Sequence, residues 1–301
     1  MKNSLSARVG GRAMLGFLWA FHWLPMGLQA VLGRALGALL WRAARSRQRV
    51  TLRNLALCFP DKSEGERECI ARELFHLFAR SVLERGLLWF ASPKRLRRLI
   101  RVEGDVGFAD RHEGPVMWLV PHFVALDVAG VAAQLHLKRA IASIYQRQSN
   151  PVIDAAMRRG RLRLGQGNTE LFSRSETARP LMRAVRQGAG FFNLPDMDFG
   201  SRDAAFVPFF GVPAATLLAP SRMARALRMK VQPVVAQLLP GGQGYRVRFL
   251  PPWEGFPTDD PVADTRRINE WIEQEVARMP EQYYWVHKRF KTRPEGEAGL
   301  Y

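Results

Sequence analysis

Cysteine is scarce in this chain of 301 residues, which contains only Cys58 and Cys69. The two lie eleven positions apart, a spacing that matches neither the paired ligands of zinc sites nor the C-x-x-C motif of redox proteins. Small domains held together by disulfides carry more cysteines and work in oxidising compartments. The sequence therefore argues against a disulfide framework and fits a reducing environment.

Acidic residues are also few, because 45 lysines and arginines face only 27 aspartates and glutamates, a net charge of +18. This balance favours an anionic partner: a nucleic acid, an acidic membrane surface or an acidic protein. Basic residues cluster at 94–101, 158–163 and 288–293. No recognised nucleic-acid-binding module accompanies them, so we expect no nucleic-acid partner.

Several catalytic signatures are missing. The sequence has no G-x-x-x-x-G-K-[ST] phosphate loop and no G-x-S-x-G elbow, which disfavours an NTPase and a serine hydrolase of the α/β-hydrolase type. We expect no metal ion and no cofactor. Hydrophobic residues make up 47% of the chain, enough for the core of one large α/β domain or two small ones.

One long stretch lacks charge altogether. Residues 13–33 contain no Asp, Glu, Lys or Arg, and about 20 apolar residues suffice to span a bilayer. Pro25 and Gly27 permit a kink or a shallow hairpin that does not span. The stretch predicts a membrane anchor, and a buried pair of hydrophobic helices is the alternative.

The anchor divides the chain into two parts. We assign residues 1–42 to an N-terminal membrane-anchoring helix and residues 43–301 to a catalytic domain. Arginines are denser after the uncharged stretch than before it. Because positive residues remain on the cytoplasmic side, we expect the catalytic domain on the cytoplasmic face of the membrane.

Strand and helix patterns alternate along the rest of the chain, which predicts an α/β fold with a mostly parallel sheet flanked by helices. A capping box, Ser63 with Glu66, marks one helix start. The expected strands are 115–120, 139–145, 189–194, 231–238 and 245–250. The expected helices are 46–57, 63–90, 124–136, 151–164, 177–187, 216–228 and 262–278.

His122 and Asp127 in VPHFVALDVAG are the most informative residues. They follow a predicted buried strand, at the sheet edge where α/β proteins bind ligands. If His122 lies in the turn and Asp127 lies in the following helix, the carboxylate can hold one imidazole nitrogen and leave the other as a base. A capping histidine beside an unrelated helix aspartate is the alternative.

Asp196 and Asp198 in NLPDMDFG also follow a predicted strand. Paired carboxylates at this spacing can bind a metal, but we favour hydrogen bonding and charge positioning. A turn in which one aspartate bonds its own backbone is the alternative. The apolar segment 206–216, FVPFFGVPAAT, either lines a channel with Ala214 and Thr216 or packs in the core.

The strings HFVALD, NLPDMDFG, FVPFFGVPAAT and YYWVHKRFKTRPEG together resemble the bacterial lipid A secondary acyltransferases, the lauroyl and myristoyl group. The resemblance runs from the first apolar segment to the C-terminus and implies an α/β acyltransferase fold. It also implies functional roles for Asp196, less firmly for Asp198, and for Arg161 in RRGRLRLG. The Arg161 guanidinium could bind a phosphate or stabilise oxyanion charge, whereas a basic run is more often a solvated face.

The activity that the resemblance implies is O-acyl transfer from acyl carrier protein to a hydroxyl of a 3-hydroxyacyl chain on a Kdo-bearing lipid A precursor. His122 is then the general base and Asp127 orients it. The lipid A precursor and anionic lipid of the bacterial inner membrane are the other expected partners. Two alternatives are an acyltransferase for a lysophospholipid or glycerol phosphate and a non-enzymatic basic protein that binds membrane surfaces.

Overall fold

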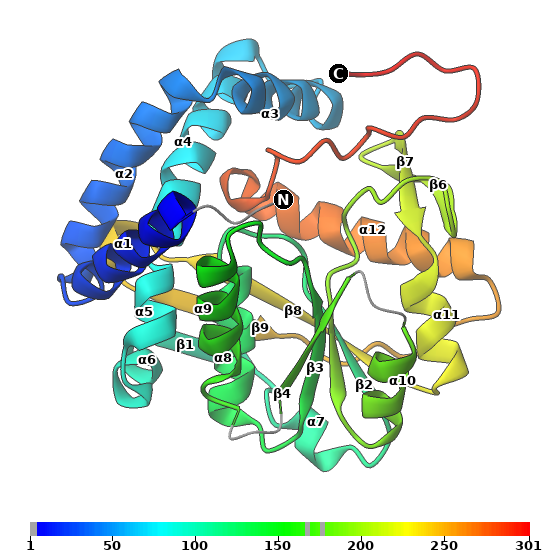
Figure 1. Ribbon diagram of the computed structural model, residues 1–301. Coiled ribbons are helices and arrows are strands. Elements are labelled where there is room, and N and C mark those ends of the chain that lie inside the picture. Colours follow the sequence, from blue (N-terminus) through cyan, green and yellow to red (C-terminus); the bar gives the residue numbers. More distant parts are fainter. Residues whose placement is uncertain (1–4, 166–168, 175–177) are drawn as a thin grey trace.

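A seven-stranded sheet forms the centre of the computed structural model, which describes residues 5–165, 169–174 and 178–301 (Figure 1). The strand order is β1-β9-β8-β2-β5-β3-β4, and every neighbouring pair is parallel except β8 and β9. The strands are β1 (Ile100–Gly104), β2 (Val116–Leu119), β3 (Ile141–Tyr145), β4 (Thr169–Ser173), β5 (Gly190–Asn193), β8 (Lys230–Leu238) and β9 (Tyr245–Phe249). The predicted α/β fold with a mostly parallel sheet is confirmed.

Helices cover both faces of this sheet (Figure 1). On one face, buried side chains such as Trp118 and Phe192 pack against α5 (Arg85–Phe90), α6 (Pro93–Leu99), α8 (Leu126–His136) and α9 (Pro151–Leu162). On the other face, Met117 and Phe191 pack against α3 (Arg45–Cys58), α4 (Glu64–Leu83), α10 (Arg179–Arg186), α11 (Ala219–Ala226) and α12 (Pro261–Arg278). Alternate residues of each strand therefore enter two separate cores.

Most predicted elements lie within a few residues of the observed ones. The Ser63–Glu66 capping box is present and starts α4. The helix predicted for 63–90 is broken at Glu84 into α4 and α5. The helix predicted from residue 216 begins at Ala219. The basic stretch 94–101 is mostly helix α6. The predicted start of the 177–187 helix lies outside the described residues. Strands β1 and β4 and the short elements α7 (Phe108–Arg111), η1 (Pro240–Gly242) and η2 (Pro280–Gln282) were not predicted.

The uncharged stretch does not form the single N-terminal helix that was predicted, and the break lies at the kink or hairpin that Pro25 and Gly27 permit. It is divided between α1 (Leu5–Phe21) and α2 (Met26–Ala43), with Pro25 at the N-cap of α2. Proline lacks the amide hydrogen that would continue α1 and is tolerated where a new helix begins. Within the described part of the chain, no helix combines the length and apolar character that crossing a bilayer requires.

Both N-terminal helices pack on the rest of the protein. Helix α1 contacts α5 and α9, and α2 contacts α4 along its length. Two glycines make the second contact close: a Cβ added to Gly33 would lie 2.7 Å from Arg80 Cβ, and one added to Gly37 would lie 2.5 Å from His76 Cα. Residues with larger side chains would force α2 and α4 apart.

The segment 206–216 belongs to a small antiparallel hairpin, β6 (Ala204–Phe209) and β7 (Val212–Leu217). Ala214 and Thr216 are buried, and the Thr216 hydroxyl accepts a hydrogen bond from buried Arg289 at 2.7 Å. The core-packing alternative is therefore the correct one for these two residues.

Candidate active site

His122 and Asp196 come together at the C-terminal edge of the sheet. Strands β2 and β5 are parallel neighbours, with Leu119 opposite Asn193. Each site residue lies three positions beyond its strand residue, so both reach the same place. The His122 ring nitrogen Nδ1 lies 2.6 Å from Asp196 Oδ1, and the His122 main-chain N–H donates to Asp196 Oδ2 at 2.8 Å.

The ionisation of Asp196 determines the tautomer of this pair. Burial raises the pKa of Asp196, but the His122 ring beside it and hydrogen bonds from His122 and Tyr283 hold that pKa below its ordinary value. An ionised carboxylate only accepts hydrogen bonds, so Nδ1 of His122 carries the proton. Nε2 is then unprotonated and available as a base.

The C-terminal segment fixes the turn that holds His122. The Val124 N–H donates to the Gln282 carbonyl at 2.8 Å, and the Tyr284 N–H donates to the His122 carbonyl at 3.0 Å. Tyr283 lies between Gln282 and Tyr284 in the chain and is buried. Its backbone forms a β-bridge with Phe123, and its side chain forms a hydrogen bond with Asp196. Burial and the neighbouring Asp196 charge raise the pKa of Tyr283 well above its usual value. Tyr283 therefore acts as a hydrogen-bond donor behind the pair.

Asp127 lies in the helix that follows the His122 turn, as predicted, but its partner differs from the predicted one. It lies in the first turn of α8, where its Oδ1 accepts two hydrogen bonds from Arg161 of α9, at 2.6 and 2.9 Å. Arg85 Nε lies 3.9 Å from its other oxygen. The prediction that Asp127 holds the His122 ring is corrected, because Asp196 occupies the ring nitrogen. Asp127 is instead the counterion of two arginines.

Charge pairing keeps Asp127 ionised. Burial raises the pKa of Asp127, but Arg161 and then Arg85 outweigh this effect and leave the pKa below its ordinary value. The sequence-based alternative of a solvated Arg161 is wrong, since the side chain is held in a fixed geometry. Nothing in the sequence pointed to Arg85.

Asp198 holds the C-terminal segment rather than the histidine at 122. Its carboxylate accepts hydrogen bonds from the Thr292 N–H at 2.7 Å and the Thr292 hydroxyl at 2.8 Å. It also accepts one from the Gly200 N–H, the backbone turn considered as an alternative. The Asp198 N–H donates to His287 Nε2 at 3.1 Å, and burial lowers the pKa of His287 to about 4.

Several arginines of the basic clusters donate hydrogen bonds to backbone carbonyl groups of the same chain. Arg158 donates to the Leu171 carbonyl, Arg163 to the Leu88 and Ala91 carbonyls, and buried Arg289 to the Ala215 carbonyl. Clusters 158–163 and 288–293 are therefore not open basic faces. Arg97 and Arg98 of α6 are exposed.

A cavity of about 730 Å³ opens in front of His122. Its walls are mainly apolar and include Leu88, Met157 and Phe192, and they also carry charged side chains. The polar and charged residues on the wall include Glu84, Arg85, His122, Asp127, Arg161 and Arg174. Such a cavity accepts a ligand that combines alkyl chains with anionic groups.

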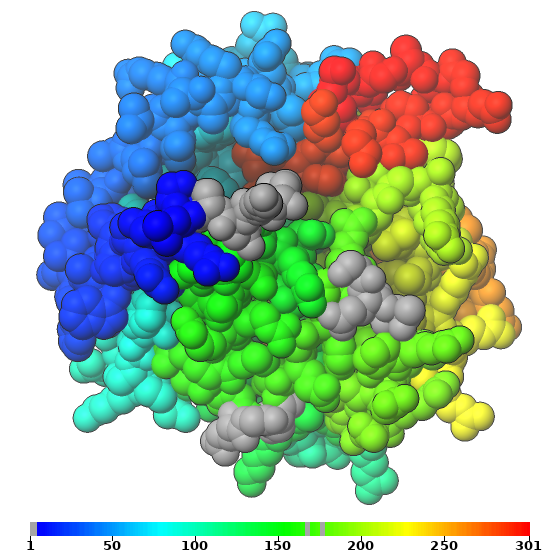
Figure 2. Space-filling view, viewed as in Figure 1, coloured from blue at the N-terminus to red at the C-terminus, as the bar shows by residue number. Residues whose placement is uncertain are grey.

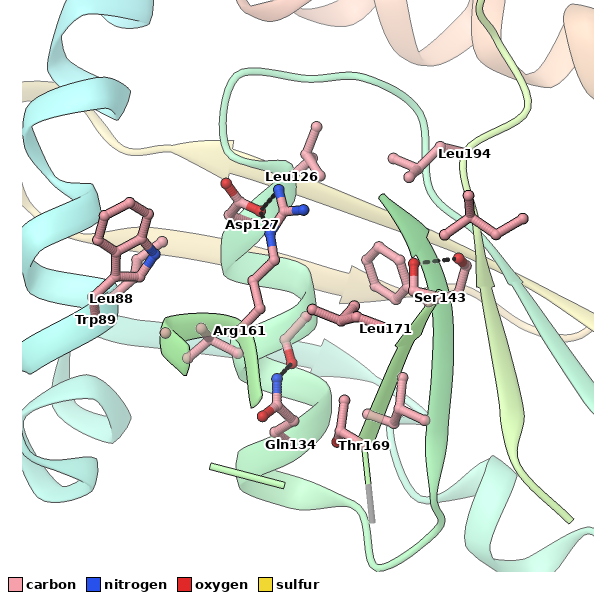
Figure 3. A pocket seen from close by; sticks show the side chains of 16 residues that line it. Leu88, Trp89, Leu126, Asp127, Gln134, Ser143, Arg161, Thr169, Leu171 and Leu194 are labelled. Carbon is pink, nitrogen blue, oxygen red and sulfur yellow. Dashed lines mark hydrogen bonds and ion pairs between the residues drawn. The ribbon is translucent and has the colours of Figure 1, made fainter. Parts of the chain in front are cut away.

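A second, narrow cavity of about 70 Å³ lies beside the first (Figure 3). The two share the walls formed by Leu126, Asp127 and Arg161. The narrow cavity continues between the sheet and helices α8 and α9, where its lining is mainly apolar and includes the polar side chains of Ser143, Gln134 and Thr169.

The histidine–carboxylate pair lies at the C-terminal edge of the sheet and faces a cavity lined mainly by apolar side chains. This arrangement suits an enzyme that acts on lipid-like substrates. The family described as bacterial lipid A biosynthesis acyltransferase matches residues 4–292. The chain belongs to this family and is an acyltransferase of lipid A biosynthesis.

Three relatives from Escherichia coli (strain K12) show the same similarity. The chain is 33% identical to the lipid A biosynthesis palmitoleoyltransferase over 95% of its own length and 92% of that protein. It is 33% identical to the lauroyltransferase, with 95% and 93% covered, and 32% identical to the myristoyltransferase, with 88% and 82% covered.

Proposed function

We propose that the protein transfers a fatty acyl chain from acyl carrier protein to a hydroxyl of a 3-hydroxyacyl chain on a Kdo-bearing lipid A precursor. The observation that carries the proposal is the His122–Asp196 pair, whose free ring nitrogen faces a cavity with alkyl-lined walls and arginines. The printed names of the relatives, which are acyltransferases of lipid A biosynthesis, support the substrate class.

His122 acts as the general base in this proposal. Its Nε2 removes the proton of the acceptor hydroxyl while the oxygen attacks the carbonyl carbon of the acyl thioester. The new ester C–O bond forms, the C–S bond breaks, and the proton passes from His122 to the departing thiolate. Asp196 keeps the ring oriented and stabilises the imidazolium between these steps.

In this proposal Asp127 positions two arginines. It holds Arg161 by two hydrogen bonds and lies close to Arg85, and all three line the cavity with His122. A guanidinium fixed in this way can stabilise negative charge on the thioester oxygen or bind a phosphate of the acceptor. In this proposal Arg161 acts on the substrate and Asp127 is a positioning residue.

We place the site at the cytoplasmic face of the bacterial inner membrane. Large apolar side chains of α1, of α2 and of the turn between them face outward, including Trp23 of the turn at 66% and Val31 of α2 at 62% exposure. The N-terminal helices lie at the surface of the molecule (Figure 2, blue). Arg12 of α1 and Arg34 of α2 are also exposed. Helices of this character lie in the membrane interface and are attracted by anionic lipid.

The donor assignment rests on charge. Acyl carrier protein is a small acidic protein, and this chain carries a net charge of +18. Arginines stay exposed on α6 (Arg97 and Arg98) and on α10 (Arg179, Arg183 and Arg186). Extended positive surface speeds the encounter with an acidic protein more than with a small phosphorylated cofactor.

The test is an assay of the purified full-length protein in neutral detergent, with transfer followed by mass spectrometry. The acceptors are a Kdo-bearing lipid A precursor, the same precursor without Kdo, and a lysophospholipid. The donors are acyl carrier protein and coenzyme A carrying the same chain. We expect efficient transfer from the carrier protein to the Kdo-bearing acceptor. Preference for the lysophospholipid, or binding of lipid without any turnover, would support one of the two alternatives instead.

A further inference from the structure

We propose that Gly130 sets the longest acyl chain that this enzyme accepts, because it leaves open the narrow cavity in which the donated chain lies. The proposal rests on the proposed acyl transfer and specifies which donors the same site takes. It is carried by the shape of the narrow cavity, the free space beside Gly130 and the polar groups at the far end.

The narrow cavity runs away from the site inside the core. Leu126 and Leu194, at the C-terminal edge of the sheet, line one end, and Gln134 and Thr169 lie at the other (Figure 3). Helix α8 forms one wall from Asp127 to Gln134. Seven helical residues rise about 10 Å, so this wall follows a substantial part of an extended alkyl chain.

Gly130 lies on this wall one turn after Asp127. A Cβ added at Gly130 would meet no heavy atom of the described chain within 4 Å, so the space beside this glycine is open and a larger side chain would extend into the cavity. Gly160, on the opposite helix, differs: its added Cβ would lie 2.2 Å from the Trp89 ring. Gly160 is needed for packing, whereas Gly130 leaves space that no neighbouring side chain uses.

The far end of the cavity is polar. Gln134 Nε2 donates to the Gly130 carbonyl at 3.1 Å. Within residues 5–165, 169–174 and 178–301, neither Gln134 Oε1 nor the Thr169 hydroxyl has a hydrogen-bond partner. Both oxygens are already shielded from water, so the two side chains close this end of the cavity and an alkyl chain could pass only by displacing them. The chain therefore ends before Gln134 and Thr169.

The donated chain is the occupant that fits. The acceptor carries sugars, phosphates and several chains, which require the wide cavity of about 730 Å³. The narrow cavity, at about 70 Å³, is too small for those groups and begins at Arg161 and Leu126, beside the place where the thioester must lie for attack at His122.

The experiment compares Gly130→Ala, Gly130→Leu and Gln134→Ala with the wild type. Gly65→Leu is the matched control, because Gly65 is an exposed helical glycine whose added Cβ also meets nothing within 4 Å of the described chain. Replacing a helical glycine favours the helix, and thermal melting confirms folding. Two profiles are measured for each protein: binding of saturated fatty acids of increasing length, by displacement of a fluorescent fatty acid, and transfer from acyl carrier proteins of the same lengths.

We expect both profiles to shift to shorter chains in Gly130→Leu, less so in Gly130→Ala, and to longer chains in Gln134→Ala. For the longest wild-type donor, kcat/KM in Gly130→Leu should fall at least about tenfold relative to a short donor, because each excluded methylene costs about fourfold. Gly65→Leu should match the wild type.

Unchanged profiles in folded Gly130→Leu would overturn the proposal, as would a shift that follows the chains of the acceptor and not those of the donor. The binding profile separates this inference from the proposed function. A wild type that binds with the expected length limit and transfers to no lipid A precursor would refute the proposed function alone.

Discussion

His122 and Asp196 occupy equivalent positions on neighbouring parallel strands, each three residues beyond the paired residues Leu119 and Asn193. The β2–β5 register therefore creates the 2.6 Å contact between Nδ1 and the carboxylate. A shift of either strand by one residue would separate the two and turn their side chains to the other face of the sheet.

His122→Ala should lower kcat by about 10² to 10⁴, the usual contribution of a general base. Asp196→Asn should lower it to a similar degree, because the amide leaves the imidazolium unpaired and favours the wrong tautomer. Steady-state transfer assays on folded variants, compared by thermal melting, measure both effects. Wild-type activity in either variant would rule out the pair as the catalytic base.

Asp127→Asn should cost about tenfold in kcat/KM, the effect of losing about 1.4 kcal/mol of interaction with Arg161. Asp127→Glu keeps the charge and should retain more activity than Asp127→Asn. Steady-state kcat/KM of the folded variants measures this order. A higher kcat/KM in Asp127→Asn than in Asp127→Glu would show that the charge of Asp127 is not what matters.

Stability should fall as the pH drops from about 6.5 toward 4 because of His287. Its pKa is lowered to about 4 in the folded protein, while an unfolded histidine has a pKa of about 6.5. The unfolded chain therefore binds the extra proton in this window, which costs the fold up to about 2 kcal/mol by pH 5. His287→Gln, which can still accept from the Asp198 N–H, should lose less stability over the same range. Chemical denaturation at several pH values measures the difference.

Trp23→Glu combined with Val31→Glu should release the protein from vesicles that contain anionic lipid. Both side chains are more than 60% exposed, and burying each in the membrane interface contributes about 1.5–3 kcal/mol. We expect at least a tenfold loss of bound protein in a sedimentation assay. Val262→Glu on α12, where the side chain is 44% exposed, is the control and should bind as the wild type does.

Charge reversal at Arg97 and Arg98 should raise the KM for acyl carrier protein and leave that for acyl coenzyme A nearly unchanged. Attraction between exposed charges is screened over about 8 Å at physiological salt. The wild-type kcat/KM with the carrier protein should therefore fall steeply as salt is added. Equal efficiency and equal salt dependence with the two donors would count against a carrier-protein surface on α6.

The sequence predicted the sheet, most of its helices and four residues that the structure brings to one edge of the sheet, but it paired the wrong residues. The four are His122, Asp127, Arg161 and Asp196. Asp127 seemed the partner of His122 because it lies near in sequence, whereas Asp196 lies 74 positions away. The pairing depends on the strand order, which places β5 beside β2 although β3 and β4 come between them in the chain. Two predicted strands, each followed two residues later by a polar side chain, were the available signal.

Other differences have similar causes. Residues 13–33 carry no charge, and their composition does not show that Pro25 starts a second helix. Arg289 sits in a basic string, but its environment depends on the β6–β7 hairpin folding over it. Composition indicates which environments a segment can occupy, such as a membrane, a core or a surface. Contacts with residues distant in sequence determine which of these environments it occupies.

The hydrogen bonds from Val124 to Gln282 and from Tyr284 to His122 join two segments that lie far apart in the sequence. The turn that carries the histidine is therefore held in place by main-chain groups of a distant segment. Proteolytic cleavage within that segment would loosen the turn and lower acyl transfer, although His122 and Asp196 themselves would be intact.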